Sequence, residues 1–308
     1  MNQPAISIVL PTFNGSKYIS TSIESCLNQT FKDFELIIVN DCSTDNTADI
    51  IQSYADKDGR VKIIHNAFNK KLPLSLNEGF NAAGGRYHTW TSDDNYYAPN
   101  ALETLLGVME RDRTIDFVYT DYTIINDNNK VTGKRTFGDI NVKLFQGCSA
   151  CFLYKQEIYK ANNGYNPAAF LIEDYDFFLR AFIQFTVLYL NRYDLYYYRE
   201  HGMSLTSLQS DAVNDLAKIV VERQMNRLEQ KLSKNQLTLL YRKFAVFSAV
   251  QKNNGYKYTL YLEKLWKLSK WQTLVTLAYV PALKFYQSAI FGLKSIAIFF
   301  RLLFKYFI

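Results

Sequence analysis

The feature that most constrains the fold is a regular alternation of short β-rich runs with helical patterns through the first 121 residues. The run 6–10 is almost entirely apolar, and the segment after it places Ile19, Ile23, Cys26 and Leu27 on one helical face. Further patterns predict strands over 35–39, 61–65, 86–91 and 116–121, and helices over 47–54, 75–83 and 99–110. Strands and helices that alternate at this spacing predict an α/β fold, a mostly parallel sheet with helices on both faces.

Polar loops follow three of these strands, at the sheet edge where folds of this kind bind their ligands. The loops are 11–15, 40–45 and 91–95. Turn formation alone would explain any one of them, because Asn, Asp, Ser and Gly are ordinary turn residues. Three such loops at one edge instead favour a binding site, and adjacent aspartates there would suit Mg²⁺ or Mn²⁺ on a diphosphate.

Other kinds of site have no support in the sequence. It contains neither a G-x-G dinucleotide fingerprint nor a G-K-[S/T] phosphate loop. Four cysteines are too few for a disulfide scaffold. Cys148 and Cys151 form a C-x-x-C pair without matching zinc ligands, and we expect two small buried residues on a strand. The start of the chain does not resemble a secretory signal, so a reducing cytoplasmic compartment is expected.

Charge divides the chain in two. Residues 1–214 carry 19 Lys and Arg against 25 Asp and Glu, whereas residues 215–308 carry 16 against 4. The β pattern also ends near 210, so we expect a first domain over 1–210 and an all-helical, basic extension over 211–308.

The end of the extension has an interfacial amphipathic pattern. Its late charges fall on one side of a helix, and they leave a wide apolar face of Phe291, Ile296, Phe299, Phe300, Leu303 and Phe307. We expect residues 256–308 to lie on an anionic membrane surface, at the cytoplasmic face of the cell (inner) membrane. A packed helical subdomain, a homo-oligomer interface and a membrane span remain alternatives.

Five segments resemble family 2 glycosyltransferases with the A-type fold. The segments 7–14, 29–45 and 90–95 resemble the nucleotide-sugar-binding half of that family, and 173–180 and 198–201 resemble its acceptor half. The similarity covers roughly residues 5–205, with the motifs in the expected order. It implies a catalytic domain at 1–210, with a nucleotide-sugar half to about 121 and an acceptor half over 122–210.

The resemblance also implies roles for individual residues. Thr12 and Phe13 would border uracil, Asp41 would hold its edge, and Asp93 would face the ribose. Lys70 and Lys71 lie where a basic residue could touch phosphate or base, or either could be a solvated surface residue. The full donor set implied is Pro11, Thr12, Phe13, Asn14, Asp41, Lys71 and Asp93.

Asp94 would coordinate Mn²⁺ or Mg²⁺ on the diphosphate, although the family often shows Asp-x-Asp-Asp where this chain has Thr91-Ser92-Asp93-Asp94. Asp174 would be the catalytic base. Glu173 is a further candidate, or it could complement the dipole of a helix over 173–185. His201 could contact metal or diphosphate, or be a loop histidine.

The expected function is therefore inverting, metal-dependent transfer of a sugar from a UDP-sugar to a hydroxyl of a glycan or polyprenyl-linked acceptor, in surface polysaccharide or glycolipid biosynthesis. The processive members' Gln-x-x-Arg-Trp sequence is absent, which favours transfer of one sugar per encounter. A GDP- or dTDP-sugar donor and a non-catalytic nucleotide-sugar-binding scaffold are the alternatives. No nucleic acid partner is expected.

Overall fold

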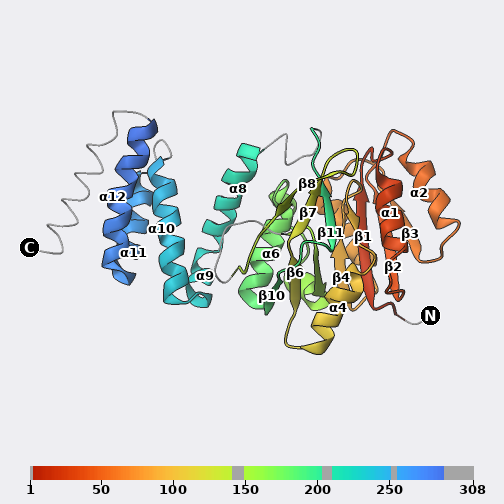
Figure 1. Ribbon diagram of the computed structural model, residues 1–308, viewed down its shortest axis with the longest axis horizontal. Coiled ribbons are helices and arrows are strands. Elements are labelled where there is room, and N and C mark those ends of the chain that lie inside the picture. Colours follow the sequence, from red (N-terminus) through yellow and green to blue (C-terminus); the bar gives the residue numbers. More distant parts are fainter. Residues whose placement is uncertain (1–2, 141–148, 203–209, 251–254, 288–308) are drawn as a thin grey trace, which may run out of the picture. The chain divides into compact units, whose positions relative to one another are not determined.

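The computed structural model describes residues 3–140, 149–202, 210–250 and 255–287 (Figure 1). The chain forms two compact units, residues 1–225 and 226–308.

The first unit is built on a seven-stranded sheet with the strand order β10-β6-β9-β4-β1-β2-β3 (Figure 1). These strands are β1 (Ile6–Thr12), β2 (Phe34–Asn40), β3 (Val61–His65), β4 (Tyr87–Trp90), β6 (Phe117–Thr120), β9 (Phe152–Lys155) and β10 (Val187–Leu190). Neighbours pair in parallel except at β9, which is antiparallel to both β4 and β6. The expected mostly parallel α/β sheet is confirmed, and β9 and β10 are strands that the patterns did not predict.

Helices cover both faces of this sheet because side chains alternate along each buried strand. Ile6, Ile8 and Leu10 of β1 belong to a core shared with α1 (Ile19–Leu27), α2 (Thr47–Ala55) and α4 (Ala101–Arg111). The alternate β1 residue Val9 contacts α3 (Leu72–Ala82) on the other face. There α6 (Glu173–Gln184) also packs, with the Phe178 ring 5.4 Å from that of Phe117 of β6. The short helix α5 (Gln156–Ala161) follows β9.

A second, four-stranded sheet, not expected from the sequence, has the order β5-β11-β7-β8. Its strands are β5 (Tyr96–Tyr97), β7 (Tyr122–Ile125), β8 (Val131–Arg135) and β11 (Tyr196–Arg199). Tyrosine rings pair across it, 4.7 Å apart for Tyr96 and Tyr197 and 4.9 Å for Tyr122 and Tyr198. Because β5 directly follows the loop 91–95, this sheet brings the 199–201 segment to that loop.

Two helices begin at residues other than those expected. α3 starts at Leu72, three residues earlier, since Pro73 is well suited to a first helical turn. α4 starts at Ala101, so Pro99 precedes the helix and does not open it.

The remaining described residues are helical, as expected. α8 (Ser210–Arg223) packs against α6, so the boundary between the units falls after Met225, later than the expected 210. The helices that follow α8 are α9 (Met225–Lys231), which begins at this boundary, α10 (Lys234–Val250), α11 (Gly255–Leu268) and α12 (Lys270–Gln287). None of the helices described is both long and apolar enough to cross a membrane. The amphipathic face expected over 291–307 lies outside the described residues.

Candidate active site

Asp41 follows β2 directly and is buried, with 4% of its surface exposed. Its Oδ1 accepts hydrogen bonds from the Asn66 side chain and the Lys70 backbone N–H, both at 2.8 Å, and its Oδ2 accepts from the Lys71 backbone N–H at 2.9 Å. The carboxylate therefore fixes the loop between β3 and α3. Asn66 was not among the expected residues, and its only sequence signal is its place directly after β3.

Lys71 has φ 71° and ψ 161°, a backbone conformation that a residue with a Cβ rarely adopts. The hydrogen bond to Asp41 stabilises this conformation. The neighbouring Lys70 directs its amine away to Glu78, with Nζ 2.6 Å from Oε1. Of the two lysines, Lys71 is thus the one whose amine forms no ion pair within the described residues.

Asn14 joins the loops that follow β1 and β2. Its backbone N–H donates to Ser43 Oγ at 3.0 Å, and its side-chain Oδ1 accepts from the Thr44 N–H at 2.8 Å. Phe13, beside it, leaves 49% of its surface exposed, while Pro11 lies within β1. The structure therefore gives Asn14 a role in shaping the loop and leaves the Phe13 ring accessible to a planar group.

Thr12 joins the first loop to the third. Its Oγ1 donates to Asp93 Oδ2 at 2.5 Å, and the backbone of Gly15 lies so close that a Cβ there would be 2.2 Å from the same oxygen. Burial, together with the charge of Asp94, raises the pKa of Asp93 to about 7. The surroundings of Asp93 therefore disfavour its negative charge.

Asp94 and His201 meet at the centre of the site, with Asp94 Oδ2 3.0 Å from His201 Nε2. The other carboxylate oxygen, Oδ1, is buried and has no hydrogen-bond partner in the described part of the chain. A buried carboxylate oxygen left without a donor is costly, and it indicates that a ligand completes the site. Carboxylate oxygen and imidazole nitrogen both suit a divalent cation such as Mn²⁺. The residues present therefore fit the expected metal, although no cluster of three or more His, Cys, Asp or Glu occurs among those described.

Arg199 forms hydrogen bonds with the Asp94 loop, and no role was assigned to it from the sequence. It is 2% exposed, its Nε donates to the Asp94 carbonyl at 2.9 Å, and its backbone N–H donates to Asn95 Oδ1 at 2.8 Å. Its guanidinium also donates to the Asn126 carbonyl and lies 4.5 Å from the Tyr18 ring centre. The sequence did point to this residue in one way, because Arg199 lies in the segment 198–201 that resembles the family.

Glu173 and Asp174 begin α6. Glu173 is buried, and its Oε2 has no partner among the described residues. Burial raises the pKa of both carboxyls, and the charge of Asp174 raises that of Glu173 further. Asp174 Oδ1 accepts the Tyr175 N–H at 2.6 Å, which leaves Oδ2 for another partner. Two neighbouring carboxyls whose pKa values burial raises can hold or accept a proton near neutral pH.

Asp174 acts electrostatically on a tyrosine of the second sheet. Burial and the neighbouring Tyr198 raise the pKa of Tyr122, and the charge of Asp174 adds to this rise. Asp174 is thus within electrostatic reach of the stacked Tyr122–Tyr198 pair, and Tyr198 is three residues from His201. The structure therefore joins Thr12, Asp93, Asp94 and His201 directly and joins Asp41 to Lys71. For Asp174 the structure shows only the electrostatic effect of its carboxylate on Tyr122.

Of the C-x-x-C pair, only Cys151 lies among the described residues. Cys151 is buried directly before β9 rather than on it, and burial raises the pKa of its thiol to about 12. Cys148 lies outside the described residues.

Comparison with known proteins identifies the family. The model of glycosyl transferase family 2 matches residues 7–183, which is more than half of the chain. An uncharacterized glycosyltransferase of Haemophilus influenzae is 39% identical over 109 residues, 35% of this chain and 44% of that relative. The E. coli UDP-Glc:alpha-D-GlcNAc-diphosphoundecaprenol beta-1,3-glucosyltransferase WfgD is 34% identical over 134 residues, 44% of this chain and 51% of WfgD. The chain thus spans about half the length of these curated relatives.

Solved structures agree with the fold. S. aureus TarS 1–349 in complex with UDP has a TM-score of 0.58 at 18% identity, over 92% of this chain and 91% of TarS. The chain belongs to glycosyl transferase family 2, and the expected family and A-type α/β fold are confirmed.

Proposed function

We propose that this protein transfers a sugar from a UDP-sugar to a hydroxyl of a glycan or polyprenyl-linked acceptor, in the synthesis of a surface polysaccharide or glycolipid. The observation that carries the proposal is the hydrogen bond between Asp94 and His201, which leaves one buried Asp94 oxygen without a partner among the described residues, in one of the polar loops that follow the strands. WfgD, by its name, uses UDP-glucose and a diphosphoundecaprenol-linked sugar, and TarS binds UDP, which supports the same classes of donor and acceptor here.

The donor would lie along the three polar loops. Phe13 would stack on the base, Asp41 would hold the base edge through the lone pairs its three donors leave, and Asp93 would accept a ribose hydroxyl. Lys71, whose amine is free to reach a phosphate, would neutralise part of the diphosphate charge.

Asp94 and His201 would hold Mn²⁺ or Mg²⁺ against the diphosphate. Such a cation supplies stabilisation of the negative charge that grows on the departing diphosphate. Arg199 would act on this pair only by position, because its donors hold the Asp94 backbone and the 126–129 loop.

Asp174 would be the general base. As the acceptor oxygen bonds to the anomeric carbon, the bond from that carbon to the diphosphate breaks, and the hydroxyl proton passes to Asp174 Oδ2. A single displacement of this kind inverts the anomeric configuration. Its raised pKa makes Asp174 a better proton acceptor than an ordinary aspartate, and Glu173 would stay protonated beside it.

One sugar would be transferred per encounter, since the Gln-x-x-Arg-Trp sequence is absent. The basic helices beyond residue 225 would bring the enzyme to the cytoplasmic face of the membrane, as a peripheral protein, where a polyprenyl-linked acceptor lies.

The test compares nucleotides and then the metal site. In the presence of Mn²⁺, UDP is expected to raise the thermal unfolding temperature of the full chain more than GDP or dTDP does. A hundredfold excess of UDP over its dissociation constant would stabilise the folded chain by about 2.7 kcal/mol. Asp94→Ala is expected to abolish the Mn²⁺-dependent part of the shift. Glu157→Gln, which removes an exposed carboxylate on α5, is the control.

A larger rise in unfolding temperature with GDP or dTDP would show that the donor is a GDP- or dTDP-sugar and not a UDP-sugar. An unchanged Mn²⁺ response in Asp94→Ala would remove the metal assignment. Nucleotide binding without any UDP release, with every acceptor extract tried, would favour the scaffold alternative.

A further inference from the structure

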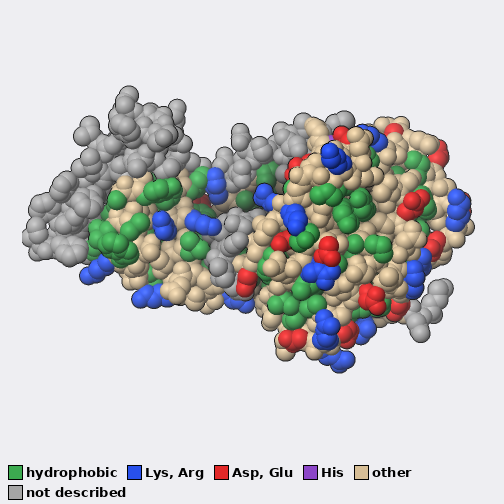
Figure 2. Space-filling model, viewed as in Figure 1, with side chains coloured by type: hydrophobic (Ala, Val, Ile, Leu, Met, Phe, Trp, Pro, Cys, Tyr) green, Lys and Arg blue, Asp and Glu red, His purple; other side chains and the backbone are tan. Residues whose placement is uncertain are grey.

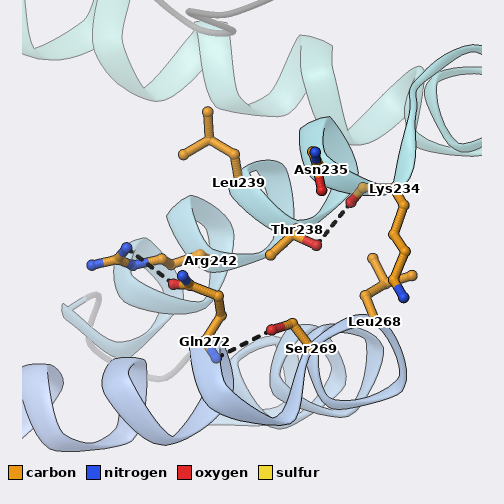
Figure 3. A pocket seen from close by; sticks show the side chains of 8 residues that line it. All are labelled: Lys234, Asn235, Thr238, Leu239, Arg242, Leu268, Ser269 and Gln272. Atoms are coloured by element: carbon orange, nitrogen blue, oxygen red, sulfur yellow. Dashed lines mark hydrogen bonds between the residues drawn. The ribbon is translucent and has the colours of Figure 1, made fainter.

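The second unit contains a pocket of about 480 Å³ between α10 and the junction of α11 with α12 (Figure 3). It is lined by Lys234, Asn235, Thr238, Leu239, Arg242, Leu268, Ser269 and Gln272. Its volume lies within the range of small-molecule sites. All its lining residues belong to residues 226–308, and none of them is a residue of the site described above.

The charge of the pocket is one-sided. Lys234 and Arg242 line it, no carboxylate does, and neither cation forms an ion pair within the described ranges. The described residues of this unit carry ten Lys and Arg against two Glu, and Figure 2 shows several of these basic side chains on its visible face. One of the two, Glu229, is already bound to Lys264, with Nζ 2.5 Å from Oε1. The unit therefore offers positive charge that its own acids do not neutralise.

Arg242 is held in place by a polar neighbour. Arg242 is half-buried, and its Nη1 donates to Gln272 Oε1 at 3.2 Å across the pocket (Figure 3). That bond uses one of its five N–H donors and leaves the others for an oxygen-rich anion. Lys234 is exposed at the first turn of α10, and Ser269 and Gln272 lie at the start of α12, so two helix dipoles add to the positive potential.

Two leucines, Leu239 and Leu268, complete the lining. Inorganic phosphate has no apolar surface that these leucines could contact. A phosphate ester, in contrast, has both a charged group and a carbon skeleton. Guanidinium and ammonium donors recognise phosphate through charge-assisted hydrogen bonds. The chemistry of the pocket thus matches a phosphate ester of small size.

We propose that this pocket binds a small phosphate ester, either the headgroup of an anionic lipid or a soluble ester, for which glycerol phosphate serves as the probe. In the first case it deepens the membrane attachment proposed above by adding a specific headgroup site to a general electrostatic attraction. It does not depend on sugar transfer or on the UDP site.

The experiment uses the full chain and two probes. sn-Glycerol 3-phosphate, titrated calorimetrically, reports the soluble ester, and flotation with phosphatidylcholine vesicles containing phosphatidylglycerol reports the lipid. The variant Lys234→Gln/Arg242→Gln is compared with Lys243→Gln/Lys267→Gln, which removes the same charge from two exposed lysines outside the pocket lining. Arg242→Lys keeps the charge, and UDP binding by each variant checks that the first unit is intact.

The pocket variant is expected to lose binding of at least one probe by about tenfold or more, as the loss of two charge-assisted contacts implies. The matched variant should retain glycerol phosphate affinity within about twofold, and Arg242→Lys should keep part of the binding. Loss of binding to both probes would show that the pocket takes the soluble ester, whereas loss of vesicle binding alone would show that it takes only the lipid headgroup.

Equal weakening by the two double variants would overturn the proposal, because binding would then depend only on total charge. Absence of binding to both probes in the unaltered chain would overturn it as well. Either result would leave the UDP-site proposal standing, because its readout is separate.

Discussion

Replacing Lys71 with glycine should stabilise the first unit, although it removes a candidate donor-binding residue. Lys71 adopts φ 71° and ψ 161°, which costs a non-glycine residue about 1–3 kcal/mol. Glycine adopts this conformation freely, but it also makes the unfolded chain more flexible, at a cost of about 0.4–1 kcal/mol. The difference between these ranges predicts a gain in the free energy of unfolding of about 0–2.6 kcal/mol, with a centre of about 1.3 kcal/mol.

The assay is urea unfolding followed by the fluorescence of Trp90, the one tryptophan of the first unit, in a background with Trp266→Phe and Trp271→Phe. Lys71→Ala is the matched comparison, because alanine loses the amine but keeps the Cβ and hence the strain. It should change stability by no more than about 0.5 kcal/mol.

Both variants should weaken UDP binding about ten- to a hundredfold if the amine touches the diphosphate, as loss of a hydrogen bond to a charged group implies. Lys71→Gly would then be more stable than the unaltered chain and yet bind the donor more weakly. If Lys71→Gly proves no more stable than Lys71→Ala, the reasoning from backbone strain is wrong.

Two further predictions concern the sheet that positions the site. Glu35→Ala should cost about 2–4 kcal/mol, because the buried Ser7 Oγ–H and Gly84 N–H lose their acceptor, whereas Lys62→Met should cost less than about 1 kcal/mol since Lys62 is mostly exposed. Burial tends to raise the pKa of Glu35, but hydrogen bonds from Lys62, Ser7 and Gly84 outweigh this effect and lower the pKa. The stabilisation by Glu35 is therefore present above the pKa of the unfolded chain and is lost as pH falls through the lower pKa of the folded chain. Urea midpoints measured across acid pH should show that loss in the unaltered chain and should not show it in Glu35→Ala. Gly79→Ala should destabilise the unit by about 1–2 kcal/mol, because its Cβ would lie 2.4 Å from Val9 Cγ1 and overpacking outweighs the gain in helix propensity. Gly107→Ala, with nothing within 4 Å, should stabilise it slightly, and the same sign for both alanine variants would contradict the packing argument.

The parallel strands and their helices were predictable because periodicity along a buried strand or helix is local information. The same patterns placed Thr12, Asp41, Asp93 and Asp94 at strand ends, and the structure brings Thr12 and Asp93 into direct contact. The role of each in donor or metal binding stays a prediction.

The unpredicted parts depend on contacts between distant segments. β9 is four residues long and pairs antiparallel with β4 and β6, and β5 has only two residues, so neither has a strong periodic pattern. Arginine is rarely buried, and nothing local to Arg199 indicates that its guanidinium would find carbonyl partners at residues 94 and 126. The left-handed backbone of Lys71 likewise follows from Asp41, thirty residues away in the sequence.

The most direct test of the account is the pH dependence of UDP release from a UDP-sugar, with GlcNAc-diphosphoundecaprenol as the trial acceptor and Mn²⁺ present. A base must be ionised, so activity should fall as pH decreases through the pKa of Asp174, and burial should place that fall above the pH expected for an ordinary aspartate. Asp174→Asn should lower turnover by at least ~10² with UDP affinity retained. Glu173→Gln should keep both the turnover and the acid limb, since that carboxyl remains protonated. Full turnover in Asp174→Asn would contradict the assignment of Asp174 as the base. Loss of the acid limb of the pH profile in Glu173→Gln would contradict it as well.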